Sequence, residues 1–358
     1  MFNLKPTLQT LFELQWSRKL ADYVTDLSWS NRDYLAASSG IGEVLLWNFN
    51  TEEVNLILSP EDTQEKSIDC LQFSADGQFL AAAGQEGKVR IWQILPELQL
   101  LNHWGKEGQW IEQLAWHPTQ NLLAFSIGRY VQIVDIFAEE IIVTLPFESS
   151  SVLAIAWYPS GERLAIAGNG GIKIWKNNSW DEEPIVLEMP AACTAIAWSN
   201  QGEYLAASCL DNTVLVWRFP EDNPWRMVGF EGKIRQLAWS TIPSGIAPLL
   251  AVACQNTIVV WKKQKTDKEG WLSRTLIHHG AVIKNVVFQP NTLLLSSVGT
   301  DGLLLFWKKA EQLTQSLEGV STEFSRLIWH PLGKKLALGG ANGELLILTQ
   351  STRGKGFG

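Results

Sequence analysis

The sequence predicts an all-β fold made of eight similar four-stranded units, and three observations lead to this prediction. One sequence pattern recurs eight times, at intervals of 41 to 49 residues. Each copy contains three short stretches of strand-forming residues separated by turn residues, and then a segment with room for a fourth strand. Repetition at this period is typical of arrays and propellers. We therefore expect a single β-propeller rather than the two domains that 358 residues would otherwise suggest.

An aromatic anchor residue ends the first strand of each repeat. The positions two and five residues before each anchor are apolar in every repeat, which indicates a strand with a buried face. The residue just before the anchor is often alanine, which suits a face pressed against a neighbouring sheet. The eight anchors are Trp29, Phe73, Trp116, Trp157, Trp198, Trp239, Phe288 and Trp329.

The second and third strands of each repeat are joined by a short turn. The second strand is Leu followed mostly by small residues. We expect a two-residue turn after it, whose second position is Gly or Asn in seven repeats and Arg129 in the third. The third strand ends at Trp in six repeats and at Val134 or Leu348 in the other two. Twelve of the 18 tryptophans occupy these two register positions, so we expect aromatic packing between the blades.

The N-terminal strand is predicted to complete the last blade. The eighth repeat has no segment for an outer strand, and the only spare strand is Leu11 to Leu20. Closure of this kind hides sheet edges. We expect a propeller over residues 1–349 and a flexible tail over residues 350–358. Seven blades is the alternative, because Thr241–Pro248 lengthens the sixth repeat and the third repeat lacks its terminal Trp.

Composition and charge limit the classes of function. The net charge is −8, which argues against general nucleic-acid binding, and residues 1–180 carry −9 whereas residues 181–358 carry +1. No run of about 18 apolar residues is present, so no membrane span is expected, and the N-terminus lacks the features of a secretion signal. The four cysteines form no CxxC pair, which predicts neither a metal site nor disulfides. We expect a cytoplasmic protein without metal or cofactor, monomeric outside its complex.

The repeat resembles that of the WD-repeat family, over about residues 10 to 349. The shared features are the strand of small residues, the Asp-Gly type of turn, the aliphatic strand and the terminal Trp. The Asp that follows this Trp in the family occurs only in the third repeat, as Asp135. The family's hydrogen-bonded tetrad is matched throughout only in the seventh repeat. Its members there are His279, Ser297, Asp301 and Trp307.

The resemblance implies a non-catalytic scaffold that holds other proteins on its faces. The residues agree, since no nucleophile elbow, phosphate-binding glycine loop or HExxH zinc motif is found, and no catalytic residue is predicted. Two alternatives stay open. One is an eight-bladed quinone-dependent enzyme, and the other is a propeller module of a larger assembly that also contacts lipid or nucleic acid.

Two surfaces are candidates for binding a protein partner. The first is the top face, formed by the first-strand starts and the hairpin turns, where Trp and Arg are favoured hot-spot residues. Its candidates are Trp110, Arg129, Tyr23, Glu86, Lys233 and Arg235. The second is the opposite face, where a basic edge follows the third strands of repeats four to seven. Its candidates are Lys176, Arg218, Lys262, Lys263, Lys308 and Lys309. Packing under the 102–110 loop is the alternative for Trp110, and solvated lysines are the alternative for the edge.

Overall fold

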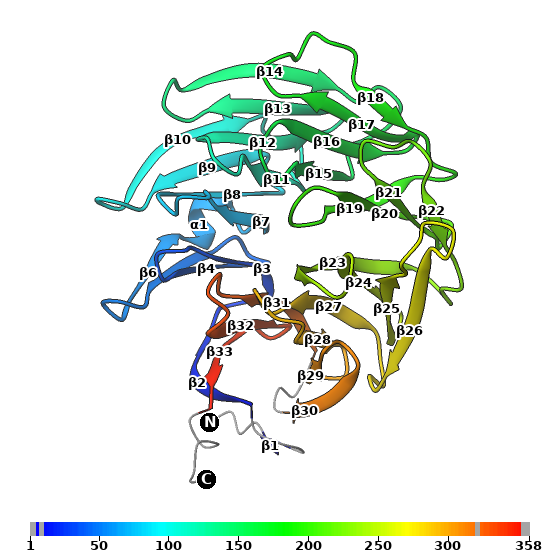
Figure 1. The fold of residues 1–358 in the computed structure, drawn as a ribbon. Helices are drawn as coiled ribbons and strands as arrows, with labels where there is room; N and C mark the ends of the chain where they lie inside the picture. Colours follow the sequence, from blue (N-terminus) through cyan, green and yellow to red (C-terminus); the bar gives the residue numbers. More distant parts are fainter. Residues whose placement is uncertain (1–4, 7–10, 319–322, 352–358) are drawn as a thin grey trace. The chain divides into compact units, whose positions relative to one another are not determined.

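The computed structural model describes residues 5–6, 11–318 and 323–351. The chain folds as a β-propeller of eight four-stranded blades, which confirms the predicted fold class and makes the seven-bladed alternative wrong (Figure 1). The chain forms two compact units. Unit 1 comprises residues 1–27 and 230–358, and unit 2 comprises residues 28–229.

Unit 2 holds the first five blades, apart from the first residues of β3, and each blade is an antiparallel sheet in chain order. Blade one contains β3 (Val24–Trp29), β4 (Tyr34–Ser39), β5 (Val44–Asn48) and β6 (Glu53–Leu58). After α1 (Pro60–Thr63), blade two contains β7 (Ile68–Phe73), β8 (Phe79–Gly84), β9 (Lys88–Gln93) and β10 (Gln99–Gly105). Blade three contains β11 (Leu114–Trp116), β12 (Leu122–Ile127), β13 (Tyr130–Asp135) and β14 (Glu140–Pro146). Blade four contains β15 (Ala154–Trp157), β16 (Arg163–Gly168), β17 (Gly171–Lys176) and β18 (Ile185–Leu187). Blade five contains β19 (Cys193–Trp198), β20 (Tyr204–Cys209), β21 (Val214–Arg218) and β22 (Trp225–Met227).

Unit 1 holds the last three blades. Blade six contains β23 (Ile234–Pro243), β24 (Pro248–Cys254), β25 (Thr257–Lys263) and β26 (Trp271–Ile277). Blade seven contains β27 (Ile283–Phe288), β28 (Leu295–Gly299), β29 (Leu303–Lys308) and β30 (Gln312–Glu318), and β1 (Lys5–Pro6) pairs with the outer edge of β30. Blade eight contains β31 (Phe324–Trp329), β32 (Lys335–Gly340), β33 (Glu344–Gln350) and β2 (Phe12–Lys19).

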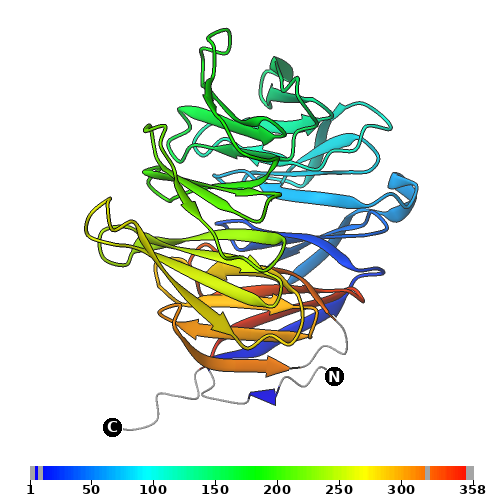
Figure 2. The same cartoon turned by 90° about the vertical axis from the view of Figure 1, so that its right-hand side faces the viewer.

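The N-terminal strand β2 is the fourth strand of blade eight, as predicted. It pairs antiparallel with β33, from Phe12 opposite Gln350 to Lys19 opposite Glu344, and the two lie side by side in both views (Figure 1, Figure 2). The Phe12 ring stacks on Phe306, with 4.9 Å between the ring centroids. The backbone N–H of Ser351 also donates to the carbonyl of Leu11, and residues 352–358 of the predicted tail lie outside the described residues.

A buried amide ties β2 to blade seven. The side chain of Gln315 is fully buried in β30, and its Oε1 accepts hydrogen bonds from the backbone N–H groups of Leu11 and Phe12, at 2.8 and 3.0 Å. Its Nε2 donates to the carbonyl of Phe12 at 2.8 Å. One side chain therefore satisfies three backbone groups at the start of the closing strand, where unpaired polar groups would be costly.

The second strands are buried on both faces. Every residue of β8 and of β12 is buried, and the run Ala81-Ala82-Ala83 in β8 is fully inaccessible to solvent. Small side chains let backbones of adjacent sheets approach closely at the density of a protein interior. The outer strands differ, since most residues of β14 are exposed.

Two anchor tryptophans, Trp116 and Trp157, hydrogen-bond to a backbone carbonyl of the preceding blade. The indole N–H of Trp116 donates to the carbonyl of Gln72, and that of Trp157 donates to the carbonyl of Ala115, each at 2.9 Å. In both hydrogen bonds the residue whose carbonyl accepts comes directly before the anchor residue of the preceding blade. Phenylalanine fills the same slot but has no donor, so Trp adds a polar tie to the burial of its ring.

Most of the twelve register tryptophans are buried, but three are not. Trp217 is 1% exposed and is the largest of the fully buried side chains, whereas Trp198, Trp239 and Trp261 are half-buried. The Trp198 ring meets Tyr158 and Phe219 edge-on, with centroids 5.0 and 5.1 Å away. The aromatic packing that the sequence predicts is thus uneven along the chain.

Blades three and six form complete four-stranded sheets despite their irregular sequences. In blade three the slot of the missing Trp is filled by Val134, which is fully buried. In blade six the insertion lengthens the hairpin between β23 and β24, with Pro243 opposite Pro248 beyond a register shift. The longer hairpin takes up the additional residues beyond Trp239, and the pairing from Gln236 to Trp239 with β24 is kept.

The predicted two-residue turn between the second and third strands is present in blades three, four and six. There the strands pair up to Ile127 opposite Tyr130, Gly168 opposite Gly171, and Cys254 opposite Thr257. In the other blades the connection is longer. In blade three the positive φ falls on Gly128 and not on the following Arg129, so arginine is tolerated there without backbone strain.

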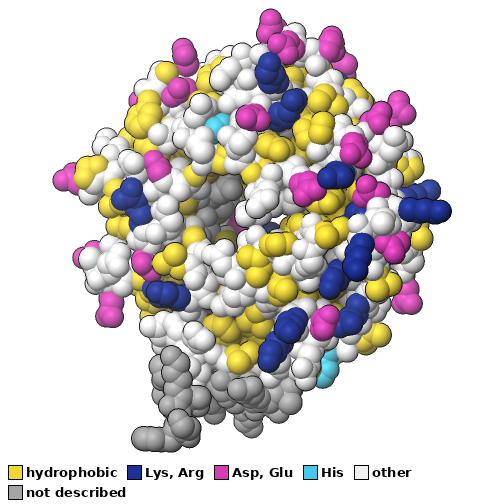
Figure 3. All heavy atoms as spheres, in the orientation of Figure 1, with side chains coloured by type: hydrophobic (Ala, Val, Ile, Leu, Met, Phe, Trp, Pro, Cys, Tyr) yellow, Lys and Arg dark blue, Asp and Glu magenta, His cyan; other side chains and the backbone are white. Residues whose placement is uncertain are grey.

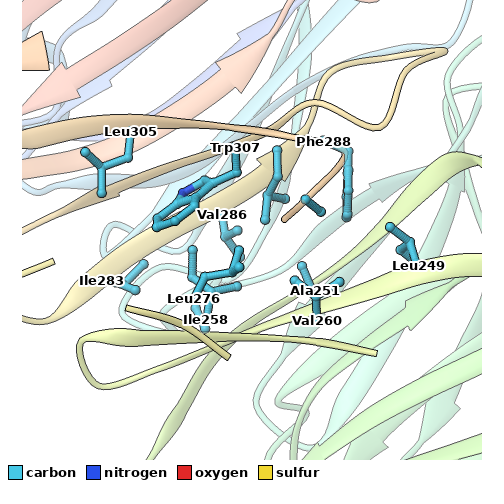
Figure 4. Packing of buried hydrophobic residues seen from close by; sticks show 13 residues of the cluster. Leu249, Ala251, Ile258, Val260, Leu276, Ile283, Val286, Phe288, Leu305 and Trp307 are labelled. Carbon is cyan, nitrogen blue, oxygen red and sulfur yellow. The ribbon is translucent and has the colours of Figure 1, made fainter. Parts of the chain in front are cut away.

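A continuous apolar cluster joins blades six and seven within unit 1. The cluster contains Ile258 and Val260 of β25, Ile283 and Val286 of β27, and Trp307 of β29 (Figure 4). Three members of the cluster, Leu249, Val260 and Ala310, also line a cavity in unit 1. The core of this unit therefore reaches the surface at the end of blade six.

Candidate docking surfaces

Trp110, the tryptophan predicted for the top face, is exposed. It lies between β10 and β11, and 49% of its surface is exposed. Its indole N–H donates to the carboxylate of Asp69 at 2.7 Å, and the hydroxyl of Ser67 donates to the same oxygen at 2.9 Å. The ring is thus held in one orientation while its face remains accessible. This exposure agrees with a surface residue and not with packing under the loop.

Arg129 also lies on unit 2, in the hairpin turn between β12 and β13. It is exposed, its guanidinium donates to the carbonyl of Glu148 at 3.4 Å, and the neighbouring Tyr130 is 49% exposed. Three further predicted residues, Tyr23, Lys233 and Arg235, are exposed on unit 1.

Glu86 is a correction to the predicted top face. It is 4% exposed, and its carboxylate is engaged by Lys88 and by Arg90, at 2.6 Å each. Burial acts to raise the pKa of Glu86, but the hydrogen bonds from Arg90 and Lys88 outweigh it and hold the pKa below its ordinary value. Glu86 neutralises the buried Arg90 within the hairpin and is not available to a partner.

The predicted basic edge divides between the two units. Lys176 and Arg218 are exposed on unit 2, where the Arg218 guanidinium lies 3.4 Å from the carboxylate of Glu203. Lys262, Lys308 and Lys309 are exposed on unit 1. None of these three makes an ion pair within the described part of the chain.

Lys263 does not belong to this surface, contrary to the prediction. It is 4% exposed, and its ammonium group contacts the carbonyl of Thr266 at 3.1 Å and the carboxylate of Asp267 at 2.9 Å. The strand β25 continues two residues past Trp261, where we expected it to end. Successive side chains of a strand point to opposite faces. Lys262 therefore points outward and Lys263 inward.

The two units differ strongly in charge. Unit 1 contains 18 Lys and Arg against 11 Asp and Glu, a net charge of +7. Unit 2 contains 11 against 26, a net charge of −15. On the face seen in Figure 3, Lys and Arg side chains gather over strands of unit 1, at the lower right. The net charges of the two sequence halves already differ in the same direction. The difference in net charge is larger when the chain is divided at the boundaries of the units.

A cavity of about 190 Å³ opens beside the basic residues of unit 1. Its apolar walls are Leu249, Val260, Leu272 and Ala310. Its polar lining consists of Ser244, Lys262, Ser273, Arg274, Lys309 and Glu311. Ser244 comes from the insertion in the β23–β24 hairpin, so the lengthened sixth repeat was the sequence signal for this cavity.

A larger, polar cavity of about 390 Å³ lies in unit 2 and contains His117 and Lys176. The His117 ring is already fully used, since Nδ1 accepts from the backbone N–H groups of Thr119 and Gln120 and Nε2 lies 3.0 Å from the carbonyl of Gly161. Burial lowers the pKa of His117, although the bond to Gly161 acts to raise it.

The role of His117 in that cavity is structural. At the same repeat position in blade seven, Gln289 donates to the carbonyl of Gly333 at 2.7 Å, the counterpart of the bond from His117 to Gly161. An amide that makes the same bond cannot act as a general base. The ring therefore ties two neighbouring turns together.

The four residues predicted as a tetrad lie in one hydrogen-bonded chain in blade seven. The indole N–H of Trp307 lies 3.1 Å from the Ser297 hydroxyl, which lies 2.9 Å from Nε2 of His279. Nδ1 of His279 lies 2.9 Å from the Asp301 carboxylate. Because an indole only donates, the hydroxyl hydrogen of Ser297 is directed to Nε2, and Nδ1–H donates to Asp301.

The comparisons with known proteins agree with this fold. Residues 27–104 match the family described as the anaphase-promoting complex subunit 4 WD40 domain, and residues 103–238 match the family described as eukaryotic translation initiation factor eIF2A. Among curated proteins, the chain is 25% identical to the anaphase-promoting complex subunit cdc20 of Dictyostelium discoideum, over 81% of this chain and 58% of that protein. It is 23% identical to the WD repeat-containing protein slp1 of Schizosaccharomyces pombe, over 80% of this chain and 58% of that protein. These matches support the resemblance to the WD-repeat family.

The match to these WD-repeat relatives is partial. The protein FIZZY-RELATED 3 of Arabidopsis thaliana is 26% identical over 80% of this chain but only 58% of its own length. The chain therefore spans less than two thirds of the length of the curated relatives that it matches. The shared region is the repeat-bearing part of this chain.

Three further features of the chain concern metals, membranes and cysteines. Among the described residues, no three His, Cys, Asp or Glu side chains are grouped so as to hold a metal ion. In the same part of the chain, no helix has the length and apolar character needed to cross a membrane. The four cysteines are buried and free.

Proposed function

We propose that this protein is a non-catalytic platform that docks partner proteins. The observation that carries the proposal is the separation of charge between the units, +7 on unit 1 and −15 on unit 2. Lys262, Lys308 and Lys309 stand exposed on unit 1 without ion pairs among the described residues, so their charge is available to a partner. Opposite charges across an interface mainly raise the association rate and select the partner.

The similar proteins support this proposal through their names. Two of them are named as a subunit of the anaphase-promoting complex and as a WD repeat-containing protein. A third, the transcriptional corepressor LEUNIG_HOMOLOG of Arabidopsis thaliana, is 26% identical over 74% of this chain and 33% of its own length. The first of these names describes a subunit of a protein complex, and we infer that this chain also works by holding proteins.

Catalysis by the polar cavity of unit 2 is disfavoured by its histidine. Both ring nitrogens of His117 are occupied by backbone groups, and Gln289 makes the same contact in blade seven. The quinone-enzyme alternative is tested by an absorbance spectrum of the purified protein, and a bound quinone would contradict the proposal. The cytoplasmic location and the monomeric state stay predictions.

The platform is tested by reversing charge at each end of blade six. Lys262, at one end, is grouped with Lys308 and Lys309 and changed to Glu, and Lys233 with Arg235, at the other end, is changed to Glu separately. Ile234 is level with Thr257 in the register, so Lys262 and the pair of Lys233 and Arg235 lie at opposite ends of the same sheet, and Lys308 and Lys309 follow the third strand of blade seven. Proteins cross-linked to each variant in extracts of the source cells are then quantified by mass spectrometry.

We expect the first variant to lose its cross-linked proteins and the second to retain them, with unchanged melting temperatures. Loss in the second variant only would move the docking surface to the top face. An identical set of captured proteins with both variants, at low and high salt, would contradict charge-directed docking on unit 1.

A further inference from the structure

The cavity of unit 1 combines an apolar floor with a cationic rim. Leu249 and Val260 form the floor, and both are almost fully buried members of the cluster that joins blades six and seven (Figure 4). Leu272 stands at the edge, with 64% of its surface exposed. An exposed leucine beside an opening to the core gives an apolar ligand group a place to be buried.

The size of the cavity fits a single side chain. Its volume of about 190 Å³ is below the range of roughly 300–1,000 Å³ that holds a drug-sized molecule. None of the described residues that line it is aromatic, and its apolar walls are aliphatic. The matching group is therefore one aliphatic side chain, such as that of leucine or isoleucine.

The rim selects for negative charge. Arg274 and Glu311 lie 2.9 Å apart and largely neutralise each other, and both side chains are more than half exposed. The other two charged lining residues, Lys262 and Lys309, have no ion pair in the described part of the chain. The unbalanced charge at the mouth is thus positive, and the surrounding unit carries +7.

We propose that this groove docks a short acidic segment of a partner protein, with one aliphatic residue in the cavity. The acidic residues on both sides of that aliphatic residue face Lys262 and Lys309. This inference rests on the proposed function and names the chemistry of the partner at that surface.

A protein segment fits the groove better than a nucleic acid does. Single-stranded nucleic acids are held by bases that stack on aromatic side chains. The groove offers aliphatic walls and hydroxyls at Ser244 and Ser273 instead. Binding of a nucleic acid in place of the peptide is kept as an outcome of the test.

The test uses a labelled peptide in which one leucine is flanked on both sides by aspartates. Its fluorescence anisotropy is measured with the full chain at several salt concentrations. Two control peptides carry serine in place of leucine, or lysines in place of the aspartates. A labelled oligothymidylate serves as the nucleic-acid probe.

Three variants separate the cavity from the rim. Ser273→Trp places an indole over the cavity from an exposed position of β26 and leaves the lysines in place. Lys262→Glu with Lys309→Glu reverses the rim. Lys334→Glu, an exposed lysine in the turn between β31 and β32, makes a similar charge change outside the groove.

We expect the leucine peptide to bind the wild-type chain, and both control peptides to bind at least about tenfold more weakly. Ser273→Trp and the rim variant should each lower its affinity by about tenfold or more, and Lys334→Glu should leave it nearly unchanged. The loss in the rim variant should shrink as salt rises, because exposed charges are screened.

Several outcomes would overturn the inference. They are equal binding of the leucine and serine peptides, binding that survives Ser273→Trp, or preferential binding of the oligothymidylate. If the leucine peptide does not bind while charge reversal of unit 1 still removes cross-linked proteins, the groove is wrong and the platform stands. If the peptide binds as expected but charge reversal changes no captured protein, the groove binds acidic peptides and the platform proposal fails.

Discussion

Units 1 and 2 are built from the same four-stranded blade but differ in their polar chemistry. Unit 1 is cationic, and its interior contains buried polar side chains such as Gln315 and the His279–Asp301 pair. Unit 2 is acidic, and Trp116 and Trp157 tie its blades through indole N–H groups on backbone carbonyls. The repeat therefore fixes the strand order while leaving the charge and the internal hydrogen bonds free to vary. Function must therefore be sought in those side chains and not in the fold.

Removing the closing strand should have the largest effect, and it should be confined to unit 1. Deletion of residues 1–20 exposes the β33 edge, uncovers Phe306 and leaves the buried Gln315 amide without its partners. We expect loss of cooperative unfolding and aggregation through the open edge. Circular dichroism melts and light scattering measure both. Gln15→Ala, at an exposed position of β2, is the control, and a soluble deletion variant with the wild-type melting temperature would show that β2 is dispensable.

Aromatic packing in unit 2 should give the next largest effect. Trp217→Ala removes a side chain that is 1% exposed, and the expected loss is about 3–5 kcal/mol of unfolding free energy. Trp198→Ala should cost less, because Trp198 is only half-buried against Tyr158 and Phe219. Urea melts of the two variants measure the difference. Equal losses would mean that the edge-on contacts of Trp198 compensate for its exposure.

Gln315→Ala should be intermediate and should act through β2. The change leaves the backbone groups of Leu11 and Phe12 without their partner, at a cost of about 2–3 kcal/mol. Gln312→Ala, in the same strand but exposed, should change stability by under about 0.5 kcal/mol. Hydrogen exchange of the β2 amides should accelerate in Gln315→Ala alone. Unchanged exchange would separate this side chain from closure of blade eight.

The strand framework could be predicted from the sequence because the same apolar pattern, which is weak evidence in one repeat, occurs in all eight. Sixteen apolar positions placed relative to eight anchors indicate one strand in every repeat, and the missing outer strand of the eighth repeat points to Leu11–Leu20. Gln315 was not predicted, since a glutamine in an outer strand is ordinarily solvated and nothing local marks the backbone groups that it meets. The repeat pattern placed the closing strand, but the hydrogen bonds of one side chain to backbone groups about 300 positions away lie beyond any pattern read along the chain.

Predictions of individual surface residues were less accurate, for reasons of strand phase and charge pairing. Lys262 and Lys263 look alike in sequence, and only the extension of β25 past Trp261 decides which one is buried. Glu86 was placed on a surface turn, but the carboxylate is buried with Arg90 because a buried cation requires a partner. A shift of one residue in a strand end is enough to exchange the inward and outward faces.

Asp301→Asn should give the smallest of these effects and should add a pH signature to unit 1. Burial acts to raise the pKa of Asp301, but its bonds with His279 and the N–H groups of Leu303 and Gly280 outweigh this, and the pKa lies below its ordinary value. A depressed carboxyl pKa stabilises the fold above the unfolded pKa, near 4, and this contribution is lost as pH falls through the folded pKa.

At pH 7 the asparagine variant should therefore be less stable than the wild type by about 1–2 kcal/mol, because it loses the charge-assisted bond to Nδ1 of His279 at 2.9 Å. The gap should stay constant from pH 7 to about pH 5 and narrow below about pH 4, where the wild-type carboxyl takes up a proton. Urea melts across this range measure the gap, and a gap that is unchanged at acid pH would assign the loss to packing.

His279→Ala and the double variant of His279 and Asp301 complete a double-mutant cycle. Since both residues belong to one chain from Trp307 through Ser297, the double variant should lose less than the sum of the single losses, and simple additivity would show that the two side chains do not interact.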